Sequence, residues 1–191
     1  MFLLKKDYYI VIDEEDLDVV TYSSDSGTTS DAIIAETENN VIQEVSSYLS
    51  GRYDISKIFV NIEEHTAGAT YAAGEFLHDS VTDKFYTALV ATSAGDLLTD
   101  DEKFAEGDTR PALIKRHVIN IALYELHSRI NPRNIPEFRI QRRDESVEWL
   151  KMVQNPRNNV SADFLLPIRD FGEKKGNDIS WNSRPKNTHQ Y

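Results

Sequence analysis

Apolar residues recur every three or four positions in three stretches of this chain, which is the spacing of one face of an α-helix. The stretches cover residues 31–50, 108–130 and 137–154. For the first stretch, Ser30 is a suitable N-cap, and Gly51 fits a left-handed stop after the last turn. Its buried face is predicted to hold Ile34, Val41, Ile42, Val45, Tyr48 and Leu49.

The second stretch is predicted to be the central helix of the fold. It begins near Asp108 and Pro111, where a capping side chain precedes a proline in the first turn. Two apolar stripes run along it, so we expect other elements to cover it on two sides. One stripe holds Ile114, Val118, Ile121 and Ala122, and the other holds Ile119, Leu123, Leu126 and Ile130.

The third predicted helix follows a linker, residues 131–136, whose prolines end the central helix. Trp149 flanks the apolar face of this helix. The face itself is predicted to hold Ile140, Val147, Leu150 and Val153.

Shorter runs of β-branched and aromatic residues predict strands. Residues 8–13 alternate in the manner of a short strand, and the acidic run at 13–18 is typical of a turn or a short helix. Between the first two helices the period changes to that of strands, before an acidic, loop-like segment at 95–107. The strands predicted there are residues 58–60, 71–77 and 85–90.

These elements predict a mainly α fold, with a three-helix core, a small β-hairpin insertion at about residues 55–106 and an extended C-terminal arm. We expect one domain over residues 1–155 and an extension over residues 156–191, because 191 residues suit one compact core with additions. No apolar run reaches the roughly 18 residues that spanning a bilayer requires, so we expect no membrane contact.

The chain carries a net charge of −11, which is unevenly distributed. Residues 1–130 hold 10 basic and 24 acidic groups, whereas residues 131–191 hold 11 basic and 8 acidic groups. An acidic body repels phosphate backbones, which disfavours nucleic-acid binding through a broad basic face. Two interpretations fit: a solvated acidic surface with a polar tail, or acidic and basic ends of neighbouring copies that meet in an assembly.

No motif in the chain points to catalysis, a cofactor or a metal ion. There is no cysteine, and the histidines lack ligand spacing: His117 and His127 stand ten residues apart, whereas helical ligand pairs stand three or four apart. The run at 13–18 lacks the central glycine of a calcium loop. Nucleophile-elbow, phosphate-loop and dinucleotide-binding motifs do not occur. We therefore expect no catalytic residue, no cofactor and no enzyme activity.

Three blocks in the predicted helices carry a resemblance. They are residues 44–54 (EVSSYLSGRYD), the block GDTR at 107–110 leading into IALYELH at 121–127, and the stretch from Ile135-Pro136 through Arg142 to Glu148-Trp149-Leu150. In this order they resemble the head-completion or head–tail connector proteins of tailed phages, particularly those of crAss-like phages. The similarity covers residues 1–155. Arg143 and Val41 depart from the family, which has an aromatic residue and an alanine there, so the packing of the third helix against the first is expected to differ.

The resemblance implies a structural virion protein, made in the host cytoplasm and located at the neck or portal vertex of the particle. It implies a homo-oligomeric ring of about twelve copies, a dodecamer, between the portal protein and the next connector or tail protein. Such a ring completes the head and lines the channel through which genomic DNA passes during packaging and ejection, without sequence-specific binding.

The polar tail over residues 172–191 is predicted to be an assembly arm that becomes ordered on a neighbouring chain. A plain solubilising tail is the alternative. The candidate interface residues on the arm are Ile179, Trp181, Arg184, Lys186 and Tyr191.

Two other functions fit the sequence. The part of the insertion from Ala69 to Phe104, with Tyr71, Gly74, Phe85 and Tyr86, is similar to small aromatic β modules that bind polysaccharide and present their aromatic side chains as an exposed platform. In a connector, we expect the same side chains to be buried in the hairpin or against a neighbouring subunit. The third interpretation is a host-directed soluble binding protein that has no place in the virion.

Overall fold

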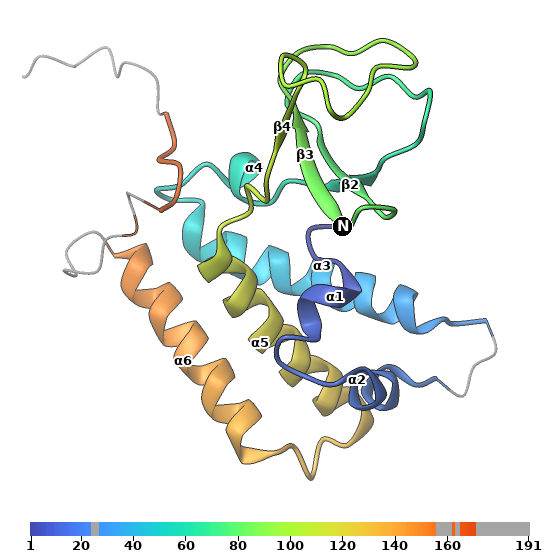
Figure 1. Ribbon diagram of the computed structural model, residues 1–191. Coiled ribbons are helices and arrows are strands. Elements are labelled where there is room, and N and C mark those ends of the chain that lie inside the picture. Colours follow the sequence, from blue (N-terminus) through green and yellow to red (C-terminus); the bar gives the residue numbers. More distant parts are fainter. Residues whose placement is uncertain (24–26, 156–161, 163–164, 171–191) are drawn as a thin grey trace, which may run out of the picture.

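The computed structural model describes residues 1–23, 27–155, 162 and 165–170 (Figure 1). In this part of the chain there are six helices and four strands. The helices are α1 (Lys5–Tyr8), α2 (Glu14–Thr21), α3 (Ser30–Leu49), α4 (Ile55–Ile58), α5 (Ala112–Ile130) and α6 (Glu137–Gln154). The strands are β1 (Ile62–Glu64), β2 (Phe76–Asp79), β3 (Lys84–Ala88) and β4 (Phe104–Glu106).

The predicted fold class, a mainly α three-helix core with a small hairpin insertion, is wrong. The described residues combine six helices with a four-stranded mixed sheet, so the fold is an α/β fold. The strand order is β1-β2-β3-β4; β1 runs parallel to β2, and the other neighbours are antiparallel. A hairpin cannot make a parallel pair, because parallel strands need a crossover connection. Residues 65–75 form that connection here.

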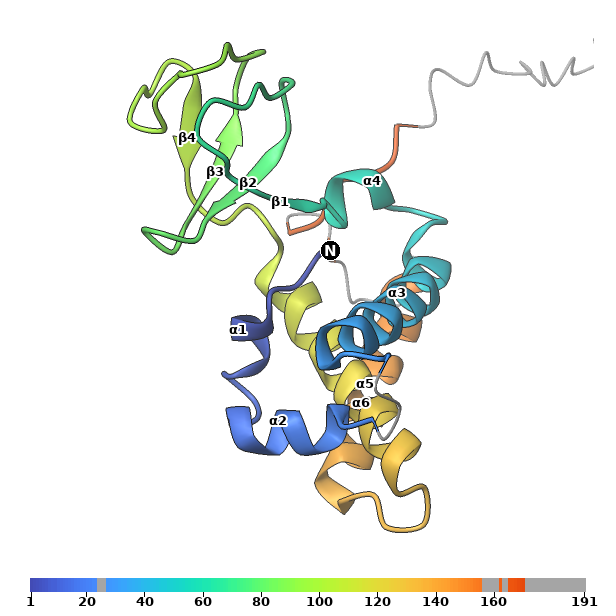
Figure 2. The same cartoon turned by 90° about the vertical axis from the view of Figure 1, so that its right-hand side faces the viewer.

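The three long helices, α3, α5 and α6, pack against one another, with α3 contacting α6 as well as α5, and together they form the helical layer of the fold (Figure 2). α5 packs against α3 and α6, and α1 and α2 also contact it. This arrangement confirms the prediction that the central helix is covered on two sides. Only Ile130, at the end of the helix, is exposed among the predicted stripe positions. The buried stripe positions are Ile114, Val118, Ile119, Ile121, Ala122, Leu123 and Leu126.

The ends and faces of the helices differ from the prediction at single positions. Thr29 caps α3 in place of Ser30, because its Oγ1 accepts a hydrogen bond from the Ala32 backbone N–H at 3.2 Å. Gly51 does not adopt a left-handed conformation. In α6, Ile140 is 39% exposed instead of buried. The neighbouring Arg139 is buried in its place.

The sheet lies at one end of the helical layer (Figure 1). Its strands are shorter than the predicted runs 71–77 and 85–90, and the predicted strand 58–60 instead ends α4. Every residue of β2 is buried, so this strand has no alternation that the sequence pattern can reveal. The sheet has a small apolar core of its own, made of Tyr71, Leu77, Tyr86, Ala88 and Phe104.

The N-terminal segment also differs from the prediction. Residues 8–13 form no strand; they end α1 and lead into α2. The acidic run at 13–18, predicted to be a turn or a short helix, forms the start of the helix α2. Glu38 of α3 holds the segment, because its Oε1 accepts hydrogen bonds from the backbone N–H groups of Phe2 (2.6 Å) and Leu3 (3.2 Å). Burial raises the pKa of Glu38, and these two hydrogen bonds oppose that shift. The first residues are therefore part of the core.

The contact between α5 and α6 includes a buried histidine. The ring of His117 stacks on the ring of Trp149, with centroids 4.4 Å apart. Neither ring nitrogen of His117 has a hydrogen-bond partner within the described part of the chain. Burial, with a smaller effect from the charge of Arg116, lowers the pKa of His117 to about 4. The ring is therefore neutral in the folded protein at neutral pH.

We expect His117 to make the protein less stable in mild acid. Between its ordinary pKa of 6.5 and its folded pKa of about 4, the unfolded state binds a proton that the folded state does not. The free energy of unfolding should therefore fall as the pH falls through this range, by about 3 kcal/mol from this group. Urea denaturation at a series of pH values measures the effect. His117→Phe keeps the stack and should remove this part of the pH dependence; parallel profiles for the two proteins would contradict the assignment.

Candidate interaction surfaces

Arg110, directly before α5, joins the sheet to the helical layer. Its buried guanidinium donates through Nη1 to Oδ2 of Asp7 at 2.7 Å and through Nε to Oδ1 of Asp108 at 2.9 Å. Nη1 also donates to the backbone carbonyl of Phe2 at 2.7 Å. The guanidinium lies over the ring of Phe85 in β3, 4.5 Å from its centroid. These contacts fix the position of the sheet relative to α1 and α5.

A second contact between the sheet and α1 involves His78 of β2. Its Nδ1 lies 3.2 Å from Oε2 of Glu64, and its Nε2 lies 3.0 Å from Oδ1 of Asp83. Asp83 also pairs with Lys6 of α1. The two carboxylates face different ring nitrogens, so the three groups do not converge on one point. In the described residues no cluster of His, Asp or Glu side chains is arranged to hold a metal ion.

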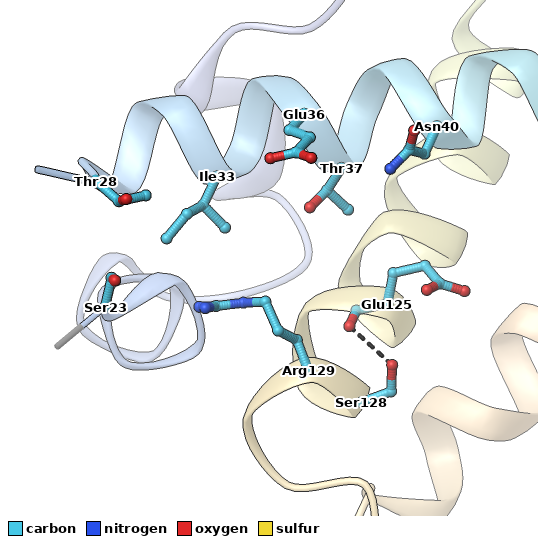
Figure 3. Close-up of a pocket in the computed structure, with 9 residues that line it drawn as sticks. All are labelled: Ser23, Thr28, Ile33, Glu36, Thr37, Asn40, Glu125, Ser128 and Arg129. Atoms are coloured by element: carbon cyan, nitrogen blue, oxygen red, sulfur yellow. Dashed lines mark hydrogen bonds between the residues drawn. The ribbon is translucent and has the colours of Figure 1, made fainter. Parts of the chain in front are cut away.

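A groove of about 510 Å³ opens between α3, the C-terminal part of α5 and the residues before α3 (Figure 3). Glu36 and Glu125 line it, and neither makes an ion pair with another described residue. Arg129 also lines the groove, but its Nη2 donates to the carbonyl oxygens of Val20 (3.1 Å) and Tyr22 (2.8 Å). In Figure 3 its side chain extends away from Glu125. We call this the acidic groove.

A second groove, of about 330 Å³, opens where the α1–α2 connection faces α5 and α6. Val11 and Ile119 contribute apolar surface to it. Arg116 and Arg142 also line it; both are exposed, and neither has a carboxylate partner in the described part of the protein. Ile10, which also lines the groove, is 84% exposed. We call this the basic groove.

Exposed apolar side chains occur at two opposite ends of the molecule, near α2 and on the β3–β4 connection (Figure 1). The first set, the bundle-end patch, is formed where α2 meets the connection between α5 and α6, and consists of Val19, Tyr22, Ile130 and Phe138. The second set, which we call the sheet-end patch, is the group of exposed apolar side chains on the β3–β4 connection: Leu89, Val90 and Leu97. All seven side chains are between 43% and 69% exposed. Exposed apolar surfaces of this kind mark sites of contact with other proteins.

The aromatic residues of the insertion do not form an exposed platform. Tyr71 and Tyr86 are buried in the sheet core. Phe85 stacks on Phe76, with ring centroids 5.4 Å apart, and its ring also faces the guanidinium of Arg110. This burial is what we expect of an insertion that packs internally.

The candidate interface residues on the predicted arm lie outside the described residues. They are Ile179, Trp181, Arg184, Lys186 and Tyr191. Sequence reasoning did not find the two grooves or the two patches, because each is assembled from elements far apart in the chain. The local sequence does not mark them: Ile10, for example, stands in an apolar run between Tyr9 and Val11.

Comparisons of this chain with models of protein families, with curated proteins and with solved structures give no match. Within the described residues, no helix has the length and apolar character needed to cross a bilayer. The functional argument therefore rests on the surfaces of the chain itself.

Proposed function

We propose that this protein is a structural subunit of a tailed-phage particle, which assembles into a ring between the portal and the tail. In this role it completes the head and surrounds the DNA channel, and it acts by binding other proteins without catalysing a reaction. The observation that supports the proposal most is the pair of apolar patches at opposite ends of the molecule. A subunit that joins a portal to a tail needs two separate surfaces for two different partners.

The connection between the two ends also fits this role. Arg110 and the His78 cluster tie the sheet to α1 and α5 through buried or half-buried polar contacts. A connector must keep its two binding surfaces at a fixed separation, and such contacts hold the sheet in place on the helices. The buried aromatic residues of the insertion favour this role over an exposed polysaccharide-binding platform.

We expect the purified chain to form higher oligomers mainly when the portal protein of the same phage is present, and to be found in purified particles. Light scattering of the mixture and mass spectrometry of the particles measure these two properties. One patch is expected to face the portal and the other the tail. Of Val19→Asp and Leu97→Asp, the variant in the patch that faces the portal should therefore weaken portal binding about tenfold or more, because a charge then replaces an apolar contact. Val81→Asp is the matched control, since Val81 is 90% exposed and lies outside both patches. A chain that stays monomeric with the portal and is absent from particles would exclude the proposal.

A further inference from the structure

The two grooves carry net charges of opposite sign: Glu36 and Glu125 outnumber Arg129 in the acidic groove, and in the basic groove Lys115, Arg116 and Arg142 outnumber Asp7. Glu36 and Glu125 line one groove, and Arg116 and Arg142 line the other, without ion-pair partners in the described part of the chain. No basic residue occurs anywhere in α3 (Ser30–Leu49), the helix that forms one wall of the acidic groove.

The two grooves open on opposite sides of the helical layer. Figure 2 shows α1 and its connection to α2 on one side of α5, and α3 on the other. The basic groove lies on the side of the α1–α2 connection, and the acidic groove lies on the side of α3. Two different, complementary surfaces on opposite sides of one subunit allow a head-to-tail contact between identical copies, and such a contact closes into a ring when the rotation between copies is suitable.

We infer that the basic groove of each subunit binds the acidic groove of the next copy, with Arg116 and Arg142 facing Glu36 and Glu125 across the contact. This inference rests on the proposed ring and names the surfaces that form it. The contact also covers Ile10, which is otherwise almost fully exposed at the basic groove. Opposite potentials on the two surfaces set the register between neighbours and disfavour a contact between two like grooves.

A second copy of this chain fits the basic groove better than a nucleic-acid backbone does. The groove combines two arginines with apolar side chains of Ile10, Val11 and Ile119, whereas backbone binding uses many basic groups on a polar surface. The net charge of −11 also opposes the approach of DNA phosphates. The contact requires an acidic surface on the partner, and every copy of this chain carries one in its acidic groove.

The test is a charge exchange between the two grooves. One variant carries Arg116→Glu with Arg142→Glu, and the other carries Glu36→Lys with Glu125→Lys. All four residues are exposed, so both variants should fold with unchanged circular dichroism. Each variant alone places like charges at every contact, and we expect its self-association to weaken about tenfold or more. An equimolar mixture should recover association, because contacts between the two variants alternate: one joins two reversed grooves and the next joins two unaltered grooves, and both kinds pair opposite charges.

Self-association is measured by light scattering at rising protein concentration and on portal rings. Binding of single subunits to the portal is measured separately, because it depends on the apolar patches and not on the grooves. Three outcomes would overturn the inference. The first is that either variant alone associates as strongly as the wild type, and the second is that the mixture fails to recover association. The third outcome is that the wild-type chain binds DNA and the arginine substitutions remove that binding. A wild-type chain that does not bind the portal at all would instead overturn the proposed function.

Discussion

Replacement of Arg110 by methionine is expected to lower the free energy of unfolding by about 3–5 kcal/mol, because it leaves a buried carboxylate without its partner. Asp7 is 6% exposed and depends on Arg110 for its closest charged contact, while Lys115 lies 3.9 Å away. Asp108 is affected as well. Burial would raise its pKa, but hydrogen bonds from Arg110 and Lys115 lower that pKa to about 2.

Urea denaturation at neutral pH measures the loss, and Arg133→Met is the control, because Arg133 is exposed and makes no ion pair in the described region. We expect the control to change stability by about 0.5 kcal/mol or less. Adding Asp7→Asn to Arg110→Met should recover part of the loss, since the isolated charge is then removed. Equal stability of Arg110→Met and the wild type would show that the guanidinium does not hold the sheet.

The second large effect is expected for Leu123→Ala in the middle of α5. Leu123 has no exposed surface and lies in the main core between the helices that cover α5. The substitution removes apolar contacts and leaves a cavity, which should cost about 2–5 kcal/mol of unfolding free energy and sharply reduce soluble expression.

Leu97→Ala is the matched substitution on the surface, because Leu97 is 69% exposed in the sheet-end patch. It should leave the stability of the isolated chain within about 0.5 kcal/mol of the wild type. Thermal melting of both variants makes the comparison. An unchanged melting temperature for Leu123→Ala would be inconsistent with a central α5 enclosed by its neighbours.

The two variants report on different parts of the protein. Leu123 tests the helical layer, whose elements the apolar pattern identifies. Arg110 tests the attachment of the sheet, for which the sequence contains no comparable signal. The sequence predicts that a helix begins near residues 108–111, with a capping side chain before Pro111. In the structure, the Asp108 carboxylate instead binds the Arg110 side chain and its backbone N–H.

The sequence by itself determined the three long helices. Their predicted bounds agree with α3, α5 and α6 to within a few residues, and most of their predicted apolar positions are buried. The physical reason is that helical hydrogen bonds join residues four apart, and an amphipathic face repeats over the same short distance. A pattern of this kind can be read from a short segment, because it does not depend on residues far away in the sequence.

Only the tertiary structure decided the sheet, the anchoring of the N-terminus and the interaction surfaces. Strand β1 pairs in parallel with β2 across residues 65–75, and Glu38 binds the backbone of residues 2 and 3. Arg110 meets Asp7 more than a hundred positions away. Strand pairing and buried ion pairs of this kind join residues at any separation in sequence, so no local period records them. The grooves and patches are made in the same way, from side chains that become neighbours only when the helices and the sheet have packed.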